Sequence, residues 1–258
     1  MSASPPAVAP ERPRRLQGQR CLVTGGSRNL GRALCLALAA AGARVAFTYL
    51  KEDEEAEFTR QQVAAVGAEV LMFKGSVTDA AHAKATVDAI VKAWGGLDVL
   101  VNNAGLMQVL PIALLEEEDW NAVLDVCLKG PYLFARSALR PMMRARRGRI
   151  LNIGSIAGGR IVDAPVHYAA AKAGLAGFTR ALAKEVGRYG ISVNELSAGL
   201  LSAGLGQQAP RHQRDDYLKN CALGRLGSLE ETADFVVWLV SDENSFMSGA
   251  QLCFDGGL

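Results

Sequence analysis

A tyrosine and a lysine four residues apart, Tyr168 and Lys172, are the side chains whose types and spacing most clearly suggest chemistry. Residues four apart on a helix share a face, so the phenol and the ammonium point the same way. The positive charge favours the phenolate and lowers the pKa of the phenol from its usual value near ~10. Ser155 follows an apolar run, 150–153, that predicts a buried strand. A carbonyl held between Ser155 and Tyr168 could then receive a proton from the phenol.

A glycine-rich segment near the N-terminus, residues 24–31, is typical of a loop that binds a nucleotide. Its sequence is Thr-Gly-Gly-Ser-Arg-Asn-Leu-Gly, between a predicted strand and a predicted helix. Gly25 lets the backbone turn sharply, and Gly31 allows close packing and backbone access to a diphosphate. The alternative is a tight turn without a ligand. Together with Ser155, Tyr168 and Lys172, the segment indicates a nucleotide-dependent redox site.

The elements that must position these residues are predicted by apolar strands that alternate with amphipathic helices. We expect strands at 21–23, 45–49, 70–73, 99–101, 150–153, 192–196 and 251–254, and helices at 30–41, 54–66, 80–94, 118–144, 168–189 and 229–240. This alternation predicts an α/β protein with a parallel, seven-stranded sheet covered by helices on both faces. In such a doubly wound fold, ligands bind beyond the carboxyl ends of the strands, where these motifs fall.

Length and composition favour one folded domain at 16–258. A chain of 258 residues can bury one sizeable core. Residues 1–15 hold four prolines, three arginines and few large apolar side chains, which favours a disordered N-terminal arm. A targeting or docking arm is the alternative, although this stretch lacks the apolar core of a secretory signal.

Charge and composition argue against several classes of partner. The sequence has no unbroken apolar run of membrane-spanning length. Its net charge of +2 is too small to favour nucleic acid or an acidic membrane as the main partner. Five cysteines, an odd number with no Cys-x-x-Cys pair, favour a reducing compartment, and we expect a cytoplasmic protein. Three scattered histidines offer no metal-ligand spacing, so we expect no metal.

A further motif, Asn102-Asn103-Ala104-Gly105, follows a predicted strand between the glycine-rich segment and Ser155. The motifs in this order resemble the short-chain dehydrogenase/reductase family, and the similarity covers 16–258. The resemblance implies a Rossmann-type fold, a homotetramer and a nicotinamide dinucleotide cofactor. It also implies that Tyr168 donates a proton to a carbonyl oxygen, that Lys172 lowers the pKa of the phenol and holds the nicotinamide ribose, and that Ser155 orients the carbonyl.

The resemblance further implies a set of cofactor-binding positions. They are Gly25, Ser27, Arg28, Asn29, Leu30, Gly31, Tyr49, Lys51, Ser76, Val77, Asn103, Ala104, Gly105, Ile153, Tyr168, Lys172, Ala198, Gly199 and Leu201. Tyr49 stands where an acidic residue would favour the dinucleotide without a 2′-phosphate. Arg28 and Lys51 could both face that phosphate, so NADPH is the expected cofactor. The alternative is that both cations are solvated surface charges. Asn102 is expected to hold its loop rather than contact the ligand.

Three cofactor-binding positions depart from the family pattern. Asn29 replaces a glycine, but asparagine is one of the few residues that tolerate a left-handed backbone, so the loop should persist. Its side chain could contact phosphate or cap the helix. Ser76 replaces an aspartate against the adenine, and its neutral hydroxyl should make a weaker contact. Ala198 replaces a proline, which leaves the entrance to the following loop, 200–224, less rigid.

Cys127 is a fourth departure and lies in a predicted catalytic position. Relatives place an asparagine there, whose amide carbonyl kinks the helix and holds a water that returns a proton to the tyrosine through the lysine. A thiol is a weak donor and acceptor. Water or backbone could still complete the relay, activity could be attenuated, or Cys127 could have another role, and we favour the first two.

The closest overall resemblance is to 3-oxoacyl-[acyl-carrier-protein] reductases, through Tyr-Ala-Ala-Ala-Lys-Ala-Gly at 168–174 and the ending 254–258. It implies a 3-oxoacyl thioester or polyketide-like ketone as substrate. Arg146 matches a basic residue that docks the acidic carrier protein, and the alternative is a solvated helix end that complements the helix dipole. A hypothesis from another class is a nucleotide-binding regulator that kept the fold with attenuated catalysis.

Overall fold

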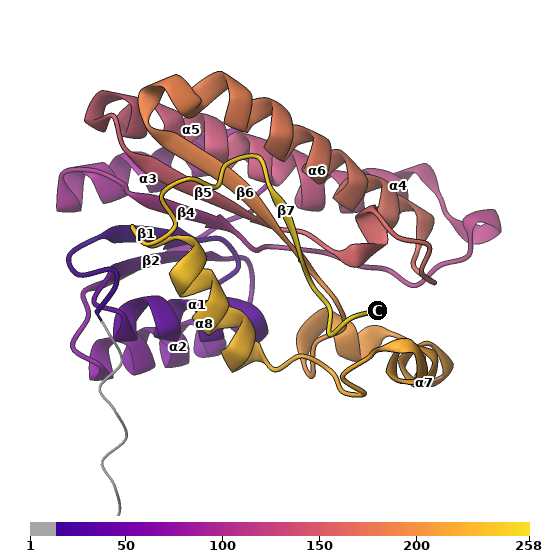
Figure 1. Ribbon diagram of the computed structural model, residues 1–258. Coiled ribbons are helices and arrows are strands. Elements are labelled where there is room, and N and C mark those ends of the chain that lie inside the picture. Colours follow the sequence, from indigo (N-terminus) through magenta and orange to yellow (C-terminus); the bar gives the residue numbers. More distant parts are fainter. Residues whose placement is uncertain (1–13) are drawn as a thin grey trace, which may run out of the picture.

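The computed structural model describes residues 14–258, and seven strands in that range form one sheet (Figure 1). The strand order is β3-β2-β1-β4-β5-β6-β7, and all neighbouring strands are parallel. The strands are β1 (Arg20–Val23), β2 (Arg44–Tyr49), β3 (Val70–Lys74), β4 (Val99–Asn102), β5 (Gly148–Ile153), β6 (Ile191–Ala198) and β7 (Gln251–Phe254). The predicted seven-stranded parallel sheet is confirmed. Its order reverses at β1, which opens a crevice beyond the carboxyl ends of β1 and β4.

Helices cover both faces of the sheet, as the sequence predicted (Figure 1). One face carries α1 (Asn29–Ala40), α2 (Asp53–Ala65) and α8 (Leu229–Leu239), and the other carries α3 (Ala80–Trp94), α4 (Glu117–Leu124), α5 (Gly130–Ala145) and α6 (Val166–Val186). α7 (Arg211–Asn220) lies beyond the carboxyl ends of the strands, near the C-terminus. Short helical turns in the connections are η1 (Ile112–Leu114), η2 (Asp125–Lys129), η3 (Ile156–Gly158), η4 (Gly187–Tyr189) and η5 (Gly204–Gln208).

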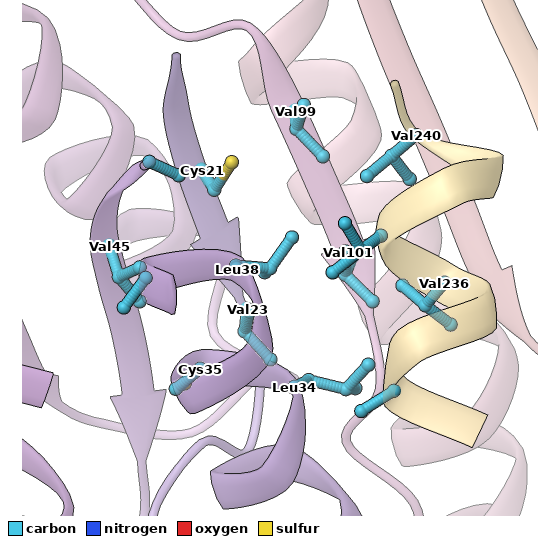
Figure 2. Packing of buried hydrophobic residues seen from close by; sticks show 14 of the residues in the cluster. Cys21, Val23, Leu34, Cys35, Leu38, Val45, Val99, Val101, Val236 and Val240 are labelled. Carbon is cyan, nitrogen blue, oxygen red and sulfur yellow. The ribbon is translucent and has the colours of Figure 1, made fainter. Parts of the chain in front are cut away.

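The core between the sheet and the helices α1 and α8 holds the glycine-rich turn, 24–31, in place. Figure 2 shows Val23 and Val101, from the central strands, packed with Leu34 and Leu38 of α1 and Val236 of α8. All five side chains are fully buried. Burial of a Val or Leu side chain contributes roughly 1.5–3 kcal/mol each. The carboxyl ends of β1 and β4 are therefore fixed next to the turn that begins α1.

The helix predicted over 118–144 is divided in the structure. α4 ends at Leu124, and η2 is a π-type turn before α5 begins. Pro131, in the first turn of α5, has no N–H to donate to the carbonyl of Cys127 four residues earlier, so the regular bonding pattern is already broken at this point. Pro141 lies inside α5 without dividing it, so a proline alone does not account for the π turn. Single π turns of this kind occur often at functional sites.

The segment 200–224, predicted as a loop, contains the helix α7. Its sequence, Arg-His-Gln-Arg-Asp-Asp-Tyr-Leu-Lys-Asn, lacks an apolar face, and Tyr217 is its buried residue. Hydrophobic periodicity therefore could not reveal it.

The N-terminal arm predicted at 1–15 lies largely outside the described residues. Arg15, which the prediction assigned to the arm, lies against the domain and pairs with Glu243 at 2.7 Å. Leu16 is fully buried. None of the helices in the described range is long and apolar enough to span a membrane.

Candidate active site

A cavity of about 1260 Å³ opens beyond the carboxyl ends of the central strands. Ser155 lies on its wall, together with every residue predicted to bind the cofactor: Gly25, Ser27, Arg28, Asn29, Leu30, Gly31, Tyr49, Lys51, Ser76, Val77, Asn103, Ala104, Gly105, Ile153, Tyr168, Lys172, Ala198, Gly199 and Leu201. Cys127 is absent from this wall and lies behind it. The fold thus gathers residues from separate parts of the sequence around one space.

The turn between β1 and α1 has the backbone geometry that its sequence predicted. Gly25 has φ +68°, and Asn29 has φ 48°, so asparagine adopts the expected left-handed conformation. A Cβ at Gly31 would collide with the carbonyl of Gly25 and with the Asn103 amide, which requires glycine at this position. The side chain of Arg28, the N-cap residue of α1, makes no capping hydrogen bond. The first N–H groups of α1 are thus left available at the cavity.

The motif after β4 holds this turn in place through hydrogen bonds. The Asn103 side chain donates to the carbonyls of Thr24 and Gly25 at 2.9 and 3.1 Å. Asn102 points instead into the sheet, where its amide donates to Asn152 Oδ1 at 2.8 Å. Asn102 therefore links β4 to β5, and the loop expected to be held by Asn102 is instead held by Asn103.

Ser155, Tyr168 and Lys172 converge from β5 and α6. Ser155 follows β5 and caps η3, and its Oγ accepts a hydrogen bond from the N–H of Ala157 at 3.2 Å. Lys172 Nζ donates to the carbonyl of Ile153 at 2.7 Å and lies 5.6 Å from the centre of the Tyr168 ring. The structure thus brings these three side chains together at the cavity.

The pKa of Tyr168 differs in its net direction from the sequence expectation. The Lys172 charge and the neighbouring Ser155 hydroxyl both lower the pKa of the phenol, as expected. Burial has the larger effect, and the pKa of Tyr168 is raised overall. Desolvation disfavours the phenolate more strongly than the ammonium favours it. Tyr168 is therefore held in its protonated form, which suits an acid.

Cys127 contacts the cavity wall through the backbone of Leu106. Its Sγ accepts a hydrogen bond from the Leu106 N–H and donates one to the Leu106 carbonyl, both at 3.3 Å. The thiol is fully buried beside Val123 and Tyr168. It therefore joins the π turn to the segment after Gly105, although with weaker bonds than an amide would make.

Charged side chains gather at the end of the cavity near β2. Arg28 pairs with Glu52 at 3.1 Å, and both residues line the cavity with Lys51. The sequence interpretation considered both cations but missed Glu52, although a carboxyl directly after Lys51 is a visible signal. The positive charge of Arg28 is thus already partly neutralised within the chain.

Ser76 has a local partner that the sequence interpretation did not foresee. Its hydroxyl lies 2.8 Å from the Thr78 hydroxyl and accepts a hydrogen bond from the Thr78 N–H at 3.2 Å. An adenine contact at Ser76 would share the hydroxyl with this turn.

Comparison with known proteins agrees with this geometry. A family model described as Enoyl-(Acyl carrier protein) reductase matches residues 25–258. The chain is 36% identical over 242 residues to 3-oxoacyl-[acyl-carrier-protein] reductase of Escherichia coli, covering 94% of this chain and 98% of that protein. A protein of the same name from Thermotoga maritima is 34% identical over 244 residues, with 95% and 99% covered.

Solved structures show the same relationship. A short-chain dehydrogenase/reductase from Serratia marcescens superposes with a TM-score of 0.88 at 34% identity, covering 94% of this chain and 98% of that chain. The chain belongs to the short-chain dehydrogenase/reductase family. It is accordingly an oxidoreductase with the Rossmann-type fold, and this family works with a nicotinamide cofactor.

In this short-chain dehydrogenase/reductase, the segment after β6 covers part of the cavity. Gly204 lies against the Asn29 side chain, and Leu205 lies against Gly105. The Tyr217 hydroxyl donates to the carbonyl of Asp255 at 2.6 Å, which anchors α7 to the end of β7. The segment 200–224 thus contacts the predicted cofactor loops.

Arg146, the predicted carrier-protein contact, lies away from the cavity of its own chain. It follows α5 and precedes β5, has φ 50°, and donates to the carbonyl of Arg188 at 3.0 Å. Ser155 follows the other end of β5. Six residues of strand separate the two ends, a length of about 20 Å at ~3.3 Å per residue. Arg146 and the cavity therefore lie at opposite ends of the strands.

Proposed function

We propose that this protein is an NADPH-dependent ketoreductase that reduces a 3-oxoacyl thioester or a polyketide-like ketone to the alcohol. The observation that carries the proposal is the convergence of Ser155, Tyr168 and Lys172 on the cavity that the glycine-rich turn also lines. One end of that cavity is suited to a nucleotide and the other to acid catalysis. The names of the relatives in Escherichia coli and Thermotoga maritima point to the same substrate class.

The residues of the first turn fit a dinucleotide. A diphosphate would lie at the uncapped start of α1, where N–H groups and the helix dipole favour negative charge. The collision that a Cβ at Gly31 would make shows how closely the turn is packed there. When bound, NADPH supplies the hydride for the carbonyl carbon.

The catalytic side chains have separate tasks in this proposal. Ser155 Oγ donates a hydrogen bond to the substrate carbonyl oxygen and holds it near the phenol. Tyr168 Oη gives its proton to that oxygen as the carbonyl carbon is reduced, and the product is an alcohol. Lys172, fixed by the Ile153 carbonyl, places its positive charge beside the phenol and stabilises the phenolate left behind.

The preference for NADPH rests on Arg28 and Lys51. Both side chains line the cavity beside Tyr49, at the end of β2 where an acidic residue would oppose a 2′-phosphate. Glu52 opposes the preference, because it pairs with Arg28 and must give up that contact or share it with the phosphate.

An apolar mouth supports an acyl or polyketide chain as the substrate. Val109 and Ile161 line the cavity while they remain exposed to solvent, and Ile161 is fully exposed. Leu106 and Met107 continue this apolar surface inward. Exposed apolar side chains at a cavity mouth are typical of a surface that contacts a hydrophobic ligand.

The placement of Arg146 limits how a carrier protein could dock. A carrier docked at Arg146 would lie at the far end of β5 from the cavity of its own chain. We therefore propose the carrier-protein contact together with the homotetramer, in which the cavity of another subunit would receive the cargo. The five unpaired cysteines support a reducing location, for which we propose the cytoplasm.

The regulator hypothesis draws its support from Cys127. The thiol makes weaker contacts than the amide it replaces, which would favour attenuated catalysis. The two bonds between Cys127 and Leu106 instead favour retained geometry, and we rank the enzyme first.

Turnover decides between the two functions. Purified protein is mixed with NADPH or NADH and a panel of acetoacetyl thioesters and cyclic and linear ketones, and nucleotide oxidation is followed by absorbance. We expect reduction of at least the thioesters, and loss of that reduction in Ser155→Ala. Tight nucleotide binding without oxidation across the panel would favour the regulator and contradict the ketoreductase.

A further inference from the structure

A buried carboxyl group, that of Glu195, lies next to the catalytic residues and has no part in the mechanism above. Glu195 is in β6 and is fully buried. Its Oε1 accepts a hydrogen bond from Gln251 Nε2 at 3.1 Å, whereas Oε2 has no hydrogen-bond partner within the described part of the chain. A buried polar atom without a partner is costly to folding. A carboxyl group kept in such a place needs a reason.

Glu195 lies against the turn that carries Ser155. A Cβ on Gly154 would collide with the Glu195 carboxyl, so the absence of a side chain at that position makes room for it. Gln251, the partner of Glu195, lies in turn beside Gly159, at the other end of the same turn. The Glu195–Gln251 pair therefore packs against both ends of the segment 154–159.

The same peptide unit connects Glu195 to the catalytic lysine. Lys172 Nζ donates to the carbonyl of Ile153, and the next residue, Gly154, contacts the Glu195 carboxyl. Val193, two residues earlier in β6, packs in the cluster that includes α6, and residues two apart in a strand share a face. The carboxyl thus lies on the face of the sheet that α6 covers.

The charged groups that act on Glu195 come from α6. Lys172 and Arg180 both lower the pKa of the carboxyl. From β7 it is faced by the neutral Gln251, and from β5 and the following turn by Gly154, which carries no charge. Burial outweighs the two cations and raises the pKa of Glu195 to about 7. The carboxyl therefore changes its charge within the ordinary working range of an enzyme.

We propose that Glu195 is a positioning residue whose ionisation controls the acidity of Tyr168 through Lys172, while its contacts with Gly154 and Gln251 hold the Ser155 turn. The inference rests on the proposed reductase function for its kinetic consequence. When Glu195 is ionised, its negative charge offsets part of the Lys172 field that lowers the pKa of the phenol. The phenol then holds its proton more tightly, and reduction slows as pH rises through the titration of Glu195.

The first test replaces Glu195 with its neutral counterpart, Glu195→Gln, which keeps an oxygen acceptor for Gln251. The control is Glu69→Gln, which removes one negative charge from an exposed ion pair with Arg44. We expect the reductive kcat of the unmodified protein and of the control to fall through an inflection near pH 7. Glu195→Gln should lack that inflection and retain only the decline at higher pH.

The second test needs no turnover and therefore separates this inference from the proposed function. Ionisation of Tyr168 is followed by tyrosinate absorbance, as the difference between each protein and the same protein with Tyr168→Phe. We expect the phenol to ionise at a lower pH in Glu195→Gln, by about one pH unit. If the panel of ketones gives no turnover, the reductase proposal fails while this titration still decides the role of Glu195.

A third variant keeps the test valid if Glu195→Gln does not fold. Gln251→Leu changes an exposed residue of the last strand and removes the hydrogen bond that lowers the pKa of Glu195. We expect the kinetic inflection to move to higher pH. Variants whose phenol titration and pH profile match those of the unmodified protein would overturn the proposal. An equal loss of kcat at every pH, with an unchanged phenol titration, would also overturn it, since that is the result of lost packing alone.

Discussion

The two ends of the cavity carry similar charges in opposite environments. Near β2, Arg28 and Glu52 form an ion pair whose side chains are 59% and 40% exposed. Near α6, Lys172 is 4% exposed and Glu195 is fully buried. Water screens the first pair, so its partners exchange contacts at little cost. At the second end, burial raises the pKa of Tyr168 and of Glu195. The same kinds of charged side chain are thus suited to binding a ligand where they are exposed, near β2, and to proton transfer where they are buried, near α6.

Loss of the buried phenol should produce the largest effect. Tyr168→Phe should lower ketone reduction by about 10²–10⁴-fold, the usual contribution of a positioned general acid. Nucleotide affinity should stay close to normal, because the ring remains. The measurement is steady-state reduction together with fluorescence titration of NADPH, and Tyr132→Phe, on the exposed face of α5, is the control. Retention of more than about half the activity would show that Tyr168 is not the acid.

Glu195 should make stability depend on pH. Between its ordinary pKa of 4.5 and about 7, the folded chain keeps a proton on Glu195 that the unfolded chain has released. The stability contributed by this group therefore falls as pH rises through that window. The free energy of unfolding of Glu195→Gln should therefore rise relative to that of the unmodified protein, by up to about 3 kcal/mol from the lower to the upper end of this pH window.

The stability difference is measured by urea unfolding at a series of pH values. Glu69→Gln should show no such trend, because its carboxyl is exposed. A gap between Glu195→Gln and the unmodified protein that stayed constant from pH 5 to pH 8 would mean that Glu195 titrates normally, and the contrast between the two ends would then fail.

Substitutions at the exposed end should act on cofactor choice and not on chemistry. Arg28→Ala should weaken NADPH binding and leave NADH binding nearly unchanged. A charge-assisted bond to phosphate contributes about 1.5–3 kcal/mol when well formed, and competition with Glu52 should hold the loss near the lower figure. Glu52→Gln should act in the opposite direction and tighten NADPH binding.

Salt sharpens this prediction, because exposed charges are screened. Fluorescence titrations at low and high ionic strength should show the NADPH preference shrinking as salt rises. Equal affinities for NADPH and NADH in the unmodified protein would rule out Arg28 and Lys51 as a phosphate site.

The smallest effect is expected at Cys127. In Cys127→Asn the longer amide would reach both backbone groups of Leu106 with stronger bonds than the thiol. Each stronger hydrogen bond should add about 0.5–1.5 kcal/mol to the free energy of unfolding. The amide carbonyl should also hold an ordered water better than the thiol, so turnover should rise a few-fold while NADPH affinity stays unchanged. Turnover and the solvent deuterium isotope effect are compared for both forms. A slower variant with the same isotope effect would mean that the packed surroundings reject the larger side chain.

Much of the sheet and of the cavity could be predicted because the signals are local. The strands are continuous apolar runs, which is typical of buried parallel strands. The left-handed backbone of Asn29 follows from the conformational freedom of asparagine. The shared face of Tyr168 and Lys172 follows from the helical repeat. The division of the helix at Cys127 was missed, and the proline at 131 would not have located it, since Pro141 lies inside α5 without dividing it.

By itself, the sequence determined which groups could do the chemistry: a phenol beside an ammonium, a hydroxyl at a strand end and a glycine-rich turn. These depend on spacing within one element or one turn. Only the tertiary structure decided that Arg28 pairs with Glu52, that Arg146 lies at the end of the strands opposite the cavity, and that Glu195 is buried beside the Ser155 turn. The reason is that each of these depends on strand order and on which face of the sheet a helix covers. Those features bring together residues that no sequence spacing relates, and the burial they create sets the pKa of Tyr168 and Glu195.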